Sequence, residues 1–439
     1  MEASIKSDTE AKLVRAIGLP GLTANIVNTT IGAGIFVLPA LVASILGAAS
    51  PLAFLVCALA MAIFVTSFAL AGSRVSVTGG PYAYVETAFG PFVGFLAGVL
   101  SFLTGLLSVS GVVRLFAASV SVLVSALDSN LGRVLVTALV FVILTWINLR
   151  GVRAGTRAVE VVTIVKLVPL VLLVGVGIFF VKGSDALAIA WPRPQLLGQG
   201  VLLLIFAFAG IEVALVPSGE VCNPALTIPR AIYLALGITT LLYVLIQFVA
   251  QGVLGVDLER FRDAPLAEVA FRFSGSAGRS FLLLAATISA LGFVMSNVLS
   301  SPRILFALAR DGFLPKFFAH VHPRFHSPDV AIVAYCTICL IVSFSASFQE
   351  LAILANVAVL LLYLLCCAAA LELMRRDVRS DGTPFTFPGA WIVPPIGVLI
   401  VIWILAHATS REFLITGVVL AIASILFLFR AKQTATVRK

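Results

Sequence analysis

The chain contains few charged residues for its length. Only 11% of its 439 residues are Asp, Glu, Lys or Arg, whereas soluble domains carry about 25%. Hydrophobic residues make up 61% of the chain. A water-soluble fold of this composition would have too few polar side chains to cover its surface. The composition therefore excludes a soluble domain and indicates an integral membrane protein.

The cysteines and the basic residues also do not indicate a disulfide framework, a metal site or nucleic-acid binding. The six cysteines lie in or beside apolar runs, which argues against an extracellular disulfide framework. Cys336 and Cys339 have the spacing of a metal-binding pair, but no second pair of ligands is evident, so we expect no metal site and no cofactor. The net charge of +9 comes from residues at the ends of apolar runs, which does not indicate nucleic-acid binding.

Long apolar runs fill most of the chain. A helix needs about 20 apolar residues to cross a hydrocarbon core of ~30 Å. The runs, bounded by charged residues or by Pro and Gly, predict an all-α protein with twelve transmembrane helices. We expect these helices near residues 20–45, 51–72, 91–120, 131–149, 157–182, 199–219, 229–255, 279–308, 330–348, 351–373, 388–408 and 413–430.

The distribution of Lys and Arg predicts the orientation of these helices. With both termini in the cytoplasm, basic residues inside outnumber those outside by about two to one, as the positive-inside rule requires. Residues 1–19 and 431–439 are then cytoplasmic segments. Short loops and the absence of a targeting segment favour the cell membrane. The loop at 128–133 has no cysteine, so no disulfide-linked accessory subunit is expected.

Two of the expected helices contain a glycine-rich interruption. The first has Gly32 and Gly34 at its middle, and the sixth has Gly210 followed by Glu212. Each glycine weakens a helix by about 1 kcal/mol. Interruptions at corresponding places in two halves are typical of a transporter with inverted repeats and a binding site near the bilayer midplane. Close packing of small residues between helices would also account for glycines here.

Four motifs give the chain a specific resemblance. They are NTTIGAGIF at 28–36, TGGPY at 78–82, FAFAGIEVALVPSGEVCNPALTIPR at 206–230 and SPRILFALARDGFLPKFFAHVHPRF at 301–325. In this order they resemble the amino acid–polyamine–organocation permeases. The resemblance implies five helices repeated with inverted topology, at residues 20–183 and 199–375, followed by two helices at 388–430. It also implies secondary transport of amino acids or related amines by alternating access.

The two interruptions suit the chemistry of an amino acid zwitterion, whose charges both need partners inside a membrane. An interruption in the first helix frees backbone N–H groups for the substrate carboxylate, and one in the sixth frees carbonyls for the ammonium group. The resemblance assigns the substrate site to Ile31, Gly32, Ala33, Gly34, Phe206, Ala207, Phe208, Ala209 and Gly210. It also implies an aromatic lid at Phe206 or Phe208 and a side-chain pocket lined by Val109 and Asn297.

Two ionisable residues are expected deep in the membrane. Glu212 matches a glutamate of the family's sixth helix, and an intramembrane carboxylate is a functional hypothesis by default. Lys166 lies nine residues after Arg157, which is ~13.5 Å along a helix. Burial disfavours the charged form of lysine, so this group could exchange a proton. By resemblance it would lie near Gly32 and a hydroxyl of Ser300 or Ser301, where it would couple transport to protons.

The sequence therefore predicts a proton-coupled amino acid importer. An exchanger, or a carrier of polyamines or amines on the same fold, is the alternative within transport. A membrane enzyme is disfavoured because the spans contain no catalytic motif. Arg114, in the third span, departs from the family pattern. Three roles stay open for it: it could face a polar cavity, pair with an acid or extend outward.

Overall fold

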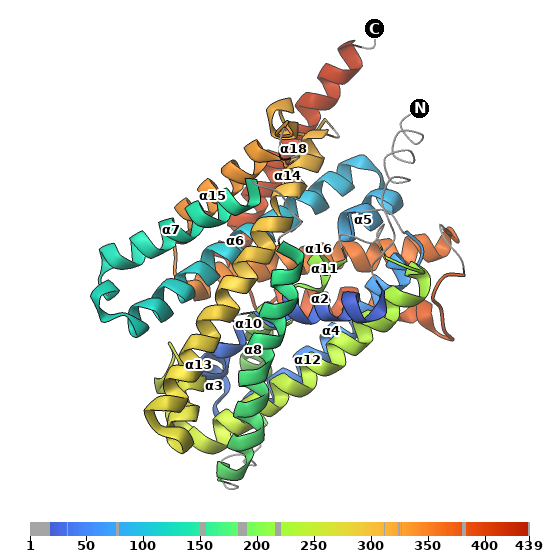
Figure 1. The fold of residues 1–439 in the computed structure, drawn as a ribbon. Coiled ribbons are helices and arrows are strands. Elements are labelled where there is room, and N and C mark those ends of the chain that lie inside the picture. The colour runs from blue at the N-terminus through green and yellow to red at the C-terminus, as the bar shows by residue number, and fades with distance from the viewer. Residues whose placement is uncertain are drawn as a thin grey trace.

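The computed structural model describes residues 18–32, 34–75, 79–149, 155–182, 191–215, 221–310, 312–323, 325, 327–379 and 383–437 (Figure 1). These residues form helices and loops and no β-strand. The elements are α2 (Leu19–Thr30), η1 (Gly34–Phe36), α3 (Leu38–Leu46), η2 (Gly47–Ala49), α4 (Ser50–Gly72), α5 (Pro81–Phe89), α6 (Pro91–Leu123), η3 (Ser125–Leu127), α7 (Asn130–Leu149), α8 (Gly155–Gly177), η4 (Ile178–Phe180), α10 (Pro194–Phe208), α11 (Ile211–Ala214), α12 (Pro224–Leu254), η6 (Gly255–Arg260), α13 (Pro265–Ser300), α14 (Pro302–Arg310), η7 (Lys316–Ala319), α15 (Asp329–Ser343), α16 (Phe348–Arg375), η8 (Ala390–Ile392), α17 (Val393–Leu405) and α18 (Ser410–Val437).

Proline marks the start of many of these helices. A proline at the first helical position has a fixed φ that suits the helix, and its missing N–H would have no partner there. The helices that begin in this way are α5, α6, α10, α12, α13 and α14. Local sequence therefore sets these boundaries directly.

Eight stretches among the described residues are long and apolar enough to cross a membrane. Three shorter apolar helices accompany them, at Val165–Phe180, Asp329–Ser343 and Ala390–Leu405. Each of the twelve predicted ranges overlaps a helix of the structure. The number of twelve crossings stays a prediction, because length and composition alone single out eight.

Burial separates central helices from peripheral ones. In the stretch that contains α10 and α11, 72% of the apolar window is buried, against 11% in α18. A helix that is apolar on all sides but scarcely buried is suited to face lipid. In Figure 1, α2, α10 and α11 lie in the middle of the bundle; α12 packs against both α2 and α4, and α16 runs along α6.

The expected helix at 279–308 differs from the structure. Helix α13 begins earlier, at Pro265, and α14 follows it from Pro302. The basic residues Arg272 and Arg279 marked this stretch as a loop in the sequence, but both lie in α13. A break occurs instead at Gly275, whose φ of +63° is a conformation that favours glycine.

Candidate functional site

The first interruption lies between α2 and η1. Helix α2 ends at Thr30, and Gly32 N–H donates a hydrogen bond to the Thr30 carbonyl at 2.9 Å. Helical structure resumes at Gly34, and Ala33 lies outside the described residues. The first N–H groups of a helix have no partner within that helix. The start of η1 therefore presents donors at the place where the sequence predicted a carboxylate site.

Lys166 of α8 closes the other side of this interruption. Its side chain is fully buried, and its Nζ donates to the carbonyls of Asn28 at 2.5 Å and Ile31 at 2.6 Å. Both carbonyls belong to the C-terminal end of α2, where the helix dipole favours a positive charge. Lysine thus caps α2 and leaves the N–H groups of η1 to other partners.

The second interruption lies between α10 and α11. Helix α10 ends at Phe208, Ala209 is extended, and Gly210 has a φ of +123° that L side chains rarely adopt. The carboxylate of Glu212 accepts the Gly210 N–H, with both oxygens at 3.0 Å. It also accepts the hydroxyl of Tyr363 at 2.8 Å. Glu212 is buried, so these contacts hold a carboxylate inside the bundle.

The two interruptions lie against each other. A Cβ added to Gly210 would stand 2.7 Å from the Thr29 carbonyl oxygen, so only glycine permits this approach. The hydroxyl of Tyr243, on α12, lies 3.1 Å from the carbonyl oxygen of Thr30 and 3.0 Å from that of Ala207. One tyrosine thus links α2 to α10 at the point where both helices stop.

The two candidate lid residues have different surroundings. Phe206 reaches the first interruption, because a Cβ added to Gly34 would lie 3.2 Å from its ring. Phe208 instead packs on Tyr243, with ring centroids 5.1 Å apart. Phe206 is therefore the phenylalanine that covers the start of η1.

Helix α13 contributes a face to the first interruption, of which the sequence predicted Asn297 but not Ser289 or Phe293. Ser289 Oγ donates to the Gly32 carbonyl at 3.3 Å, and the Phe293 ring lies 2.9 Å from a Cβ added to Gly32. Asn297 is buried one turn further on, with Nδ2 donating to the Phe293 carbonyl at 3.1 Å. The spacing of four residues places all three on one face. Counting back from Asn297 in steps of four would have found Phe293 and Ser289.

The remaining predicted residues lie elsewhere. Ser300 and Ser301 follow Ser289 by eleven and twelve residues, which is ~16–18 Å along a helix. Ser301 lies against α6, since its Oγ would be 2.5 Å from a Cβ added to Gly105. The hydroxyl of α13 that meets the first interruption is therefore Ser289. Val109 is fully buried in α6.

Arg114 has a specific partner in the structure. Its Nη1 donates to the Ser343 carbonyl at 2.9 Å. Ser343 is the last residue of α15, and a cation at a helix C-terminus satisfies carbonyls and interacts favourably with the helix dipole. Arg114 therefore joins α6 to the end of α15.

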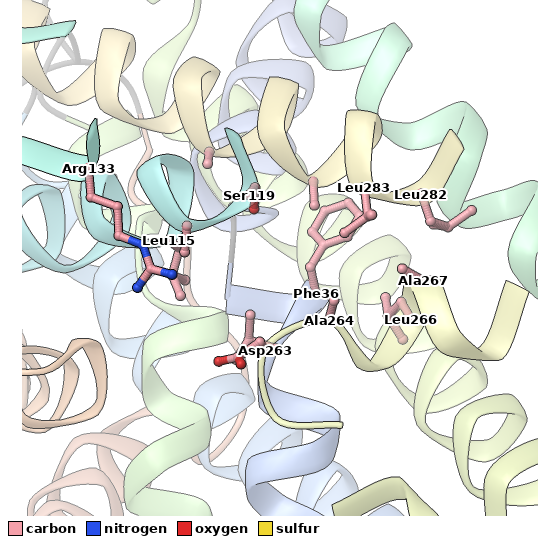
Figure 2. A pocket seen from close by; sticks show the side chains of 14 residues that line it. Phe36, Leu115, Ser119, Arg133, Asp263, Ala264, Leu266, Ala267, Leu282 and Leu283 are labelled. Atoms are coloured by element: carbon pink, nitrogen blue, oxygen red, sulfur yellow. The ribbon is translucent and has the colours of Figure 1, made fainter. Parts of the chain in front are cut away.

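A cavity of about 130 Å³ lies beside the first interruption. Phe36, two residues after Gly34, forms part of its wall together with Leu115 and Leu283. Arg133 and Asp263 bring opposite charges to one side of it (Figure 2). The cavity contains none of the predicted substrate-site residues in its lining, so it is a neighbouring space rather than the site between the two interruptions.

The described residues offer no group of three or more His, Cys, Asp or Glu that could hold a metal ion. The six cysteines all lie among the described residues, and none of them forms a disulfide there. The polar groups near the interruptions include backbone amides, hydroxyls, side-chain amides, Lys166 and Glu212, a set suited to hydrogen bonding with a small charged molecule.

The chain matches a known protein family over most of its length. The family described as "Amino acid permease" matches residues 17–429. An uncharacterised transporter of Mycobacterium tuberculosis is 32% identical over 376 residues, covering 83% of this chain and 82% of the relative. A branched-chain amino acid permease of Bacillus subtilis is 25% identical, covering 91% and 89%. A serine/threonine exchanger of the same organism is 26% identical, covering 86% and 87%.

These relatives are named as a transporter, a permease and an exchanger and not as enzymes. The family match covers most of the chain, and the helices described above include eight apolar stretches that could each cross a bilayer. The chain is a multi-pass membrane protein that belongs to the amino acid permease family.

Proposed function

We propose that this permease is a secondary active transporter that imports amino acids across the cell membrane by alternating access. In this proposal twelve helices cross the bilayer, with residues 1–19 and 431–439 in the cytoplasm. Residues 20–183 and 199–375 form two inverted repeats, and residues 388–430 add two helices. The family match and the contact between the two interrupted helices support this arrangement.

The observation that carries the proposal is the pair of protein charges at the interruptions. Lys166 occupies the carbonyl end of α2, and Glu212 occupies the N–H at the start of α11. The complementary ends are the N–H groups of η1 and the carbonyls of α10, of which that of Ala207 also lies 3.0 Å from the Tyr243 hydroxyl. They match the carboxylate and the ammonium group of a zwitterion. We therefore assign substrate binding to residues 31–34 and 206–210, with Val109 and Asn297 beside the substrate side chain.

The substrate side chain is proposed to be uncharged. Both oxygens of Glu212 already accept hydrogen bonds from Gly210, and Tyr363 adds a third. The rings of Phe206 and Phe293 lie on the glycines of the first interruption. An apolar site of this kind disfavours a second substrate charge.

Lys166 is proposed to couple transport to protons. Glu212 is proposed to stabilise a gate at the interruption between α10 and α11. The ammonium group of Lys166 donates to two carbonyls of α2. A neutral amine is a weaker donor, so loss of a proton would loosen α2 from α8. Ser289, which donates to the neighbouring Gly32 carbonyl, is proposed to take the role predicted for Ser300 or Ser301. The cavity beside Phe36 is proposed to belong to the access route.

Amino acid exchange is the second candidate, because one relative is named a serine/threonine exchanger. In an exchanger Lys166 would keep its proton throughout the cycle, and its charge would only fix the end of α2. Uptake would then need an amino acid on the opposite side of the membrane and would not need a proton gradient.

Uptake into proteoliposomes tests the proposal. Purified protein would be tested with labelled neutral, cationic and acidic amino acids and a polyamine, with and without an inward proton gradient. We expect gradient-stimulated uptake of neutral amino acids that a protonophore abolishes, and protein-free liposomes provide the background. Uptake only after preloading with an amino acid would identify an exchanger. No uptake of any amino acid under either condition would overturn the proposed function.

A further inference from the structure

Phe348, the first residue of α16, packs directly on the predicted lid. Its ring meets the Phe206 ring edge to face, with centroids 5.3 Å apart and planes at 89°. Phe348 is buried although it begins a helix. Such pairs are favoured because the positive edge of one ring meets the negative face of the other. The contact joins α16 to the end of α10.

Two glycines flank this pair of rings. A Cβ added to Gly34 would lie 3.2 Å from the ring of Phe206, and one added to Gly111, on α6, would lie 3.3 Å from the ring of Phe348. Gly34, Phe206, Phe348 and Gly111 therefore form one continuous row from η1 to α6, which we call the ring row. The absence of a Cβ at both glycines lets the two rings approach these backbones closely, and the contact between the rings transmits a change at one of them to the other.

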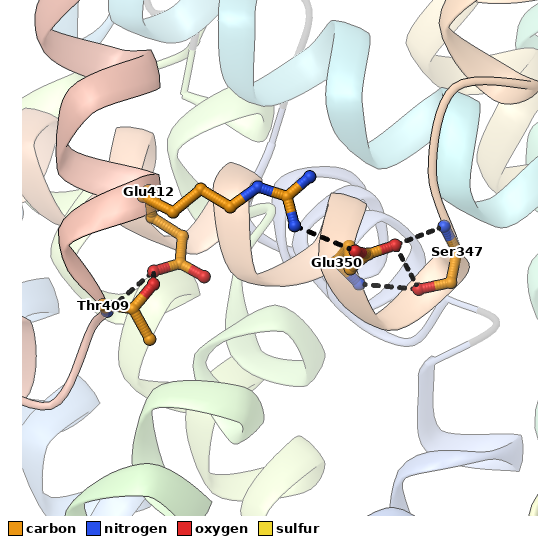
Figure 3. Close-up of polar contacts among 5 residues, drawn as sticks. Ser347, Glu350, Thr409 and Glu412 are labelled. Carbon is orange, nitrogen blue, oxygen red and sulfur yellow. Dashed lines mark hydrogen bonds and ion pairs between the residues drawn. The ribbon is translucent and has the colours of Figure 1, made fainter.

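A polar cluster fixes the start of α16, where Phe348 lies. Ser347 and Glu350 form a reciprocal capping box: Ser347 N–H donates to Glu350 Oε2 at 2.9 Å, and Glu350 N–H donates to Ser347 Oγ at 3.2 Å. Arg411, in the first turn of α18, donates to Glu350 Oε1 at 3.3 Å (Figure 3). Since Phe348 lies between Ser347 and Glu350, this cluster holds the backbone of Phe348 in a defined position relative to α18.

We propose that Phe348 forms the second half of the lid and determines which sizes of substrate side chain the site admits. The inference rests on the proposed function, because Phe206 is a lid only if a substrate binds beneath it. Phe206 covers the start of η1, and Phe348 stands behind it as a fixed stop. The distance that Phe206 can retreat from a bulky substrate is therefore set by Phe348. The capping box and Arg411 act as positioning residues.

The test compares Phe348→Ala with wild type on a series of amino acids of increasing size, from alanine to leucine to phenylalanine. We expect KM to rise about three- to tenfold for the smallest substrate, because the lid loses its support. KM for the largest substrate should fall, because Phe206 can then retreat. The double variant Phe206→Ala/Phe348→Ala should be non-additive. Phe413→Ala, at an exposed phenylalanine of α18, is the matched control and should leave the profile unchanged.

Two further variants keep the inference falsifiable if Phe348→Ala does not fold. Phe348→Leu keeps an apolar side chain of moderate size and should shift the profile in the same direction by a smaller factor. Gly111→Ala pushes the Phe348 ring toward Phe206 and should shift it in the opposite direction. A uniform loss of uptake for all sizes, or an unchanged profile, would overturn the inference. If wild type takes up amino acids and only the size profile fails to move, the proposed function stands; if wild type takes up none, both fall.

Discussion

The two interruptions hold charges of opposite sign at opposite kinds of helix end. At the first, the Lys166 ammonium binds carbonyls at the C-terminal end of α2. At the second, the Glu212 carboxylate binds the Gly210 N–H at the start of α11. Each charge suits the dipole of the end that it occupies. Each interrupted helix therefore has one of its ends bound by a charge of the protein itself.

The two charged residues also differ in how far along the chain they lie from the helix ends that they contact. Lys166 is 138 residues from Asn28, so the first interruption depends on how α8 packs against α2. Glu212 is two residues from Gly210, so the second interruption closes locally, with Tyr363 as its distant support. The first should therefore be sensitive to the packing of distant helices, and the second to local backbone conformation.

The largest expected effect comes from Gly210→Ala, which tests the local dependence of the second interruption. A Cβ at this position would meet the Thr29 carbonyl, and the φ of +123° is strained for alanine. Backbone strain of this kind costs about 1–3 kcal/mol, and overpacking costs about 1–3 kcal/mol more. We expect loss of uptake and a lower Tm. Gly237→Ala, in α12 with open space around its Cβ position, serves as the control; equal uptake in both variants would contradict the prediction.

Gly32→Leu is expected to abolish substrate binding while the protein stays folded. A leucine at this position would displace Phe293, whose ring already lies 2.9 Å from the Cβ position, and would cover the nearby N–H groups. Substrate-induced thermal stabilisation should vanish in the purified variant. The double variant Gly32→Ala/Phe293→Leu should bind substrate better than Gly32→Leu does, because a smaller side chain then replaces the ring that meets the new Cβ. Wild-type affinity in Gly32→Leu would remove this interruption from the substrate site.

Lys166→Ala tests the role of the distant charge at the first interruption. It removes two hydrogen bonds from a charged donor, each worth about 1.5–3 kcal/mol, so Tm should fall. We also expect the dependence of uptake on pH and on the proton gradient to flatten. Lys166→Gln, which keeps a donor but cannot titrate, separates the two effects by restoring part of the Tm and none of the pH dependence. An unchanged pH profile in both variants would exclude Lys166 from coupling.

The smallest effect is expected for Tyr363→Phe. The variant removes one of the hydrogen bonds to Glu212, whereas the two contacts from Gly210 persist. We expect a loss of stability of about 1.5–3 kcal/mol and a modest reduction of uptake, measured by thermal unfolding and by initial rates. Glu212→Gln should cost more, because it replaces an acceptor that serves both neighbours. The reverse order of these two variants would mean that Tyr363, rather than the local contact, holds the second interruption.

The sequence predicted the positions of both interruptions and both buried charges. Glycine weakens helices wherever it stands, so Gly32, Gly34 and Gly210 were visible without a structure. The distance of Lys166 from Arg157 along the helix predicted that its side chain is buried, and the structure confirms the burial. The sequence did not predict that Phe293, Tyr243 and Phe348 lie at the interruptions. Nothing in an apolar chain distinguishes such a tyrosine, or one phenylalanine among 32, from the others.

Arg114 shows the same limit at a charged residue. Its sequence context left three roles open, since an arginine in a span reveals no partner. The structure joins it to the carbonyl of Ser343, 229 residues away. The end of α15 lies next to α6 only because the helices pack in this order.

Composition and local pattern by themselves determined that this is a helical membrane protein with two broken helices, because hydrophobic length and glycine act on the residues next to them. The tertiary structure decided which groups meet at the breaks. Tyr363 reaches Glu212 across 151 residues and Tyr243 reaches Thr30 across 213. Such pairs depend on the rotation and depth of each helix in the bundle, and packing against all its neighbours fixes these.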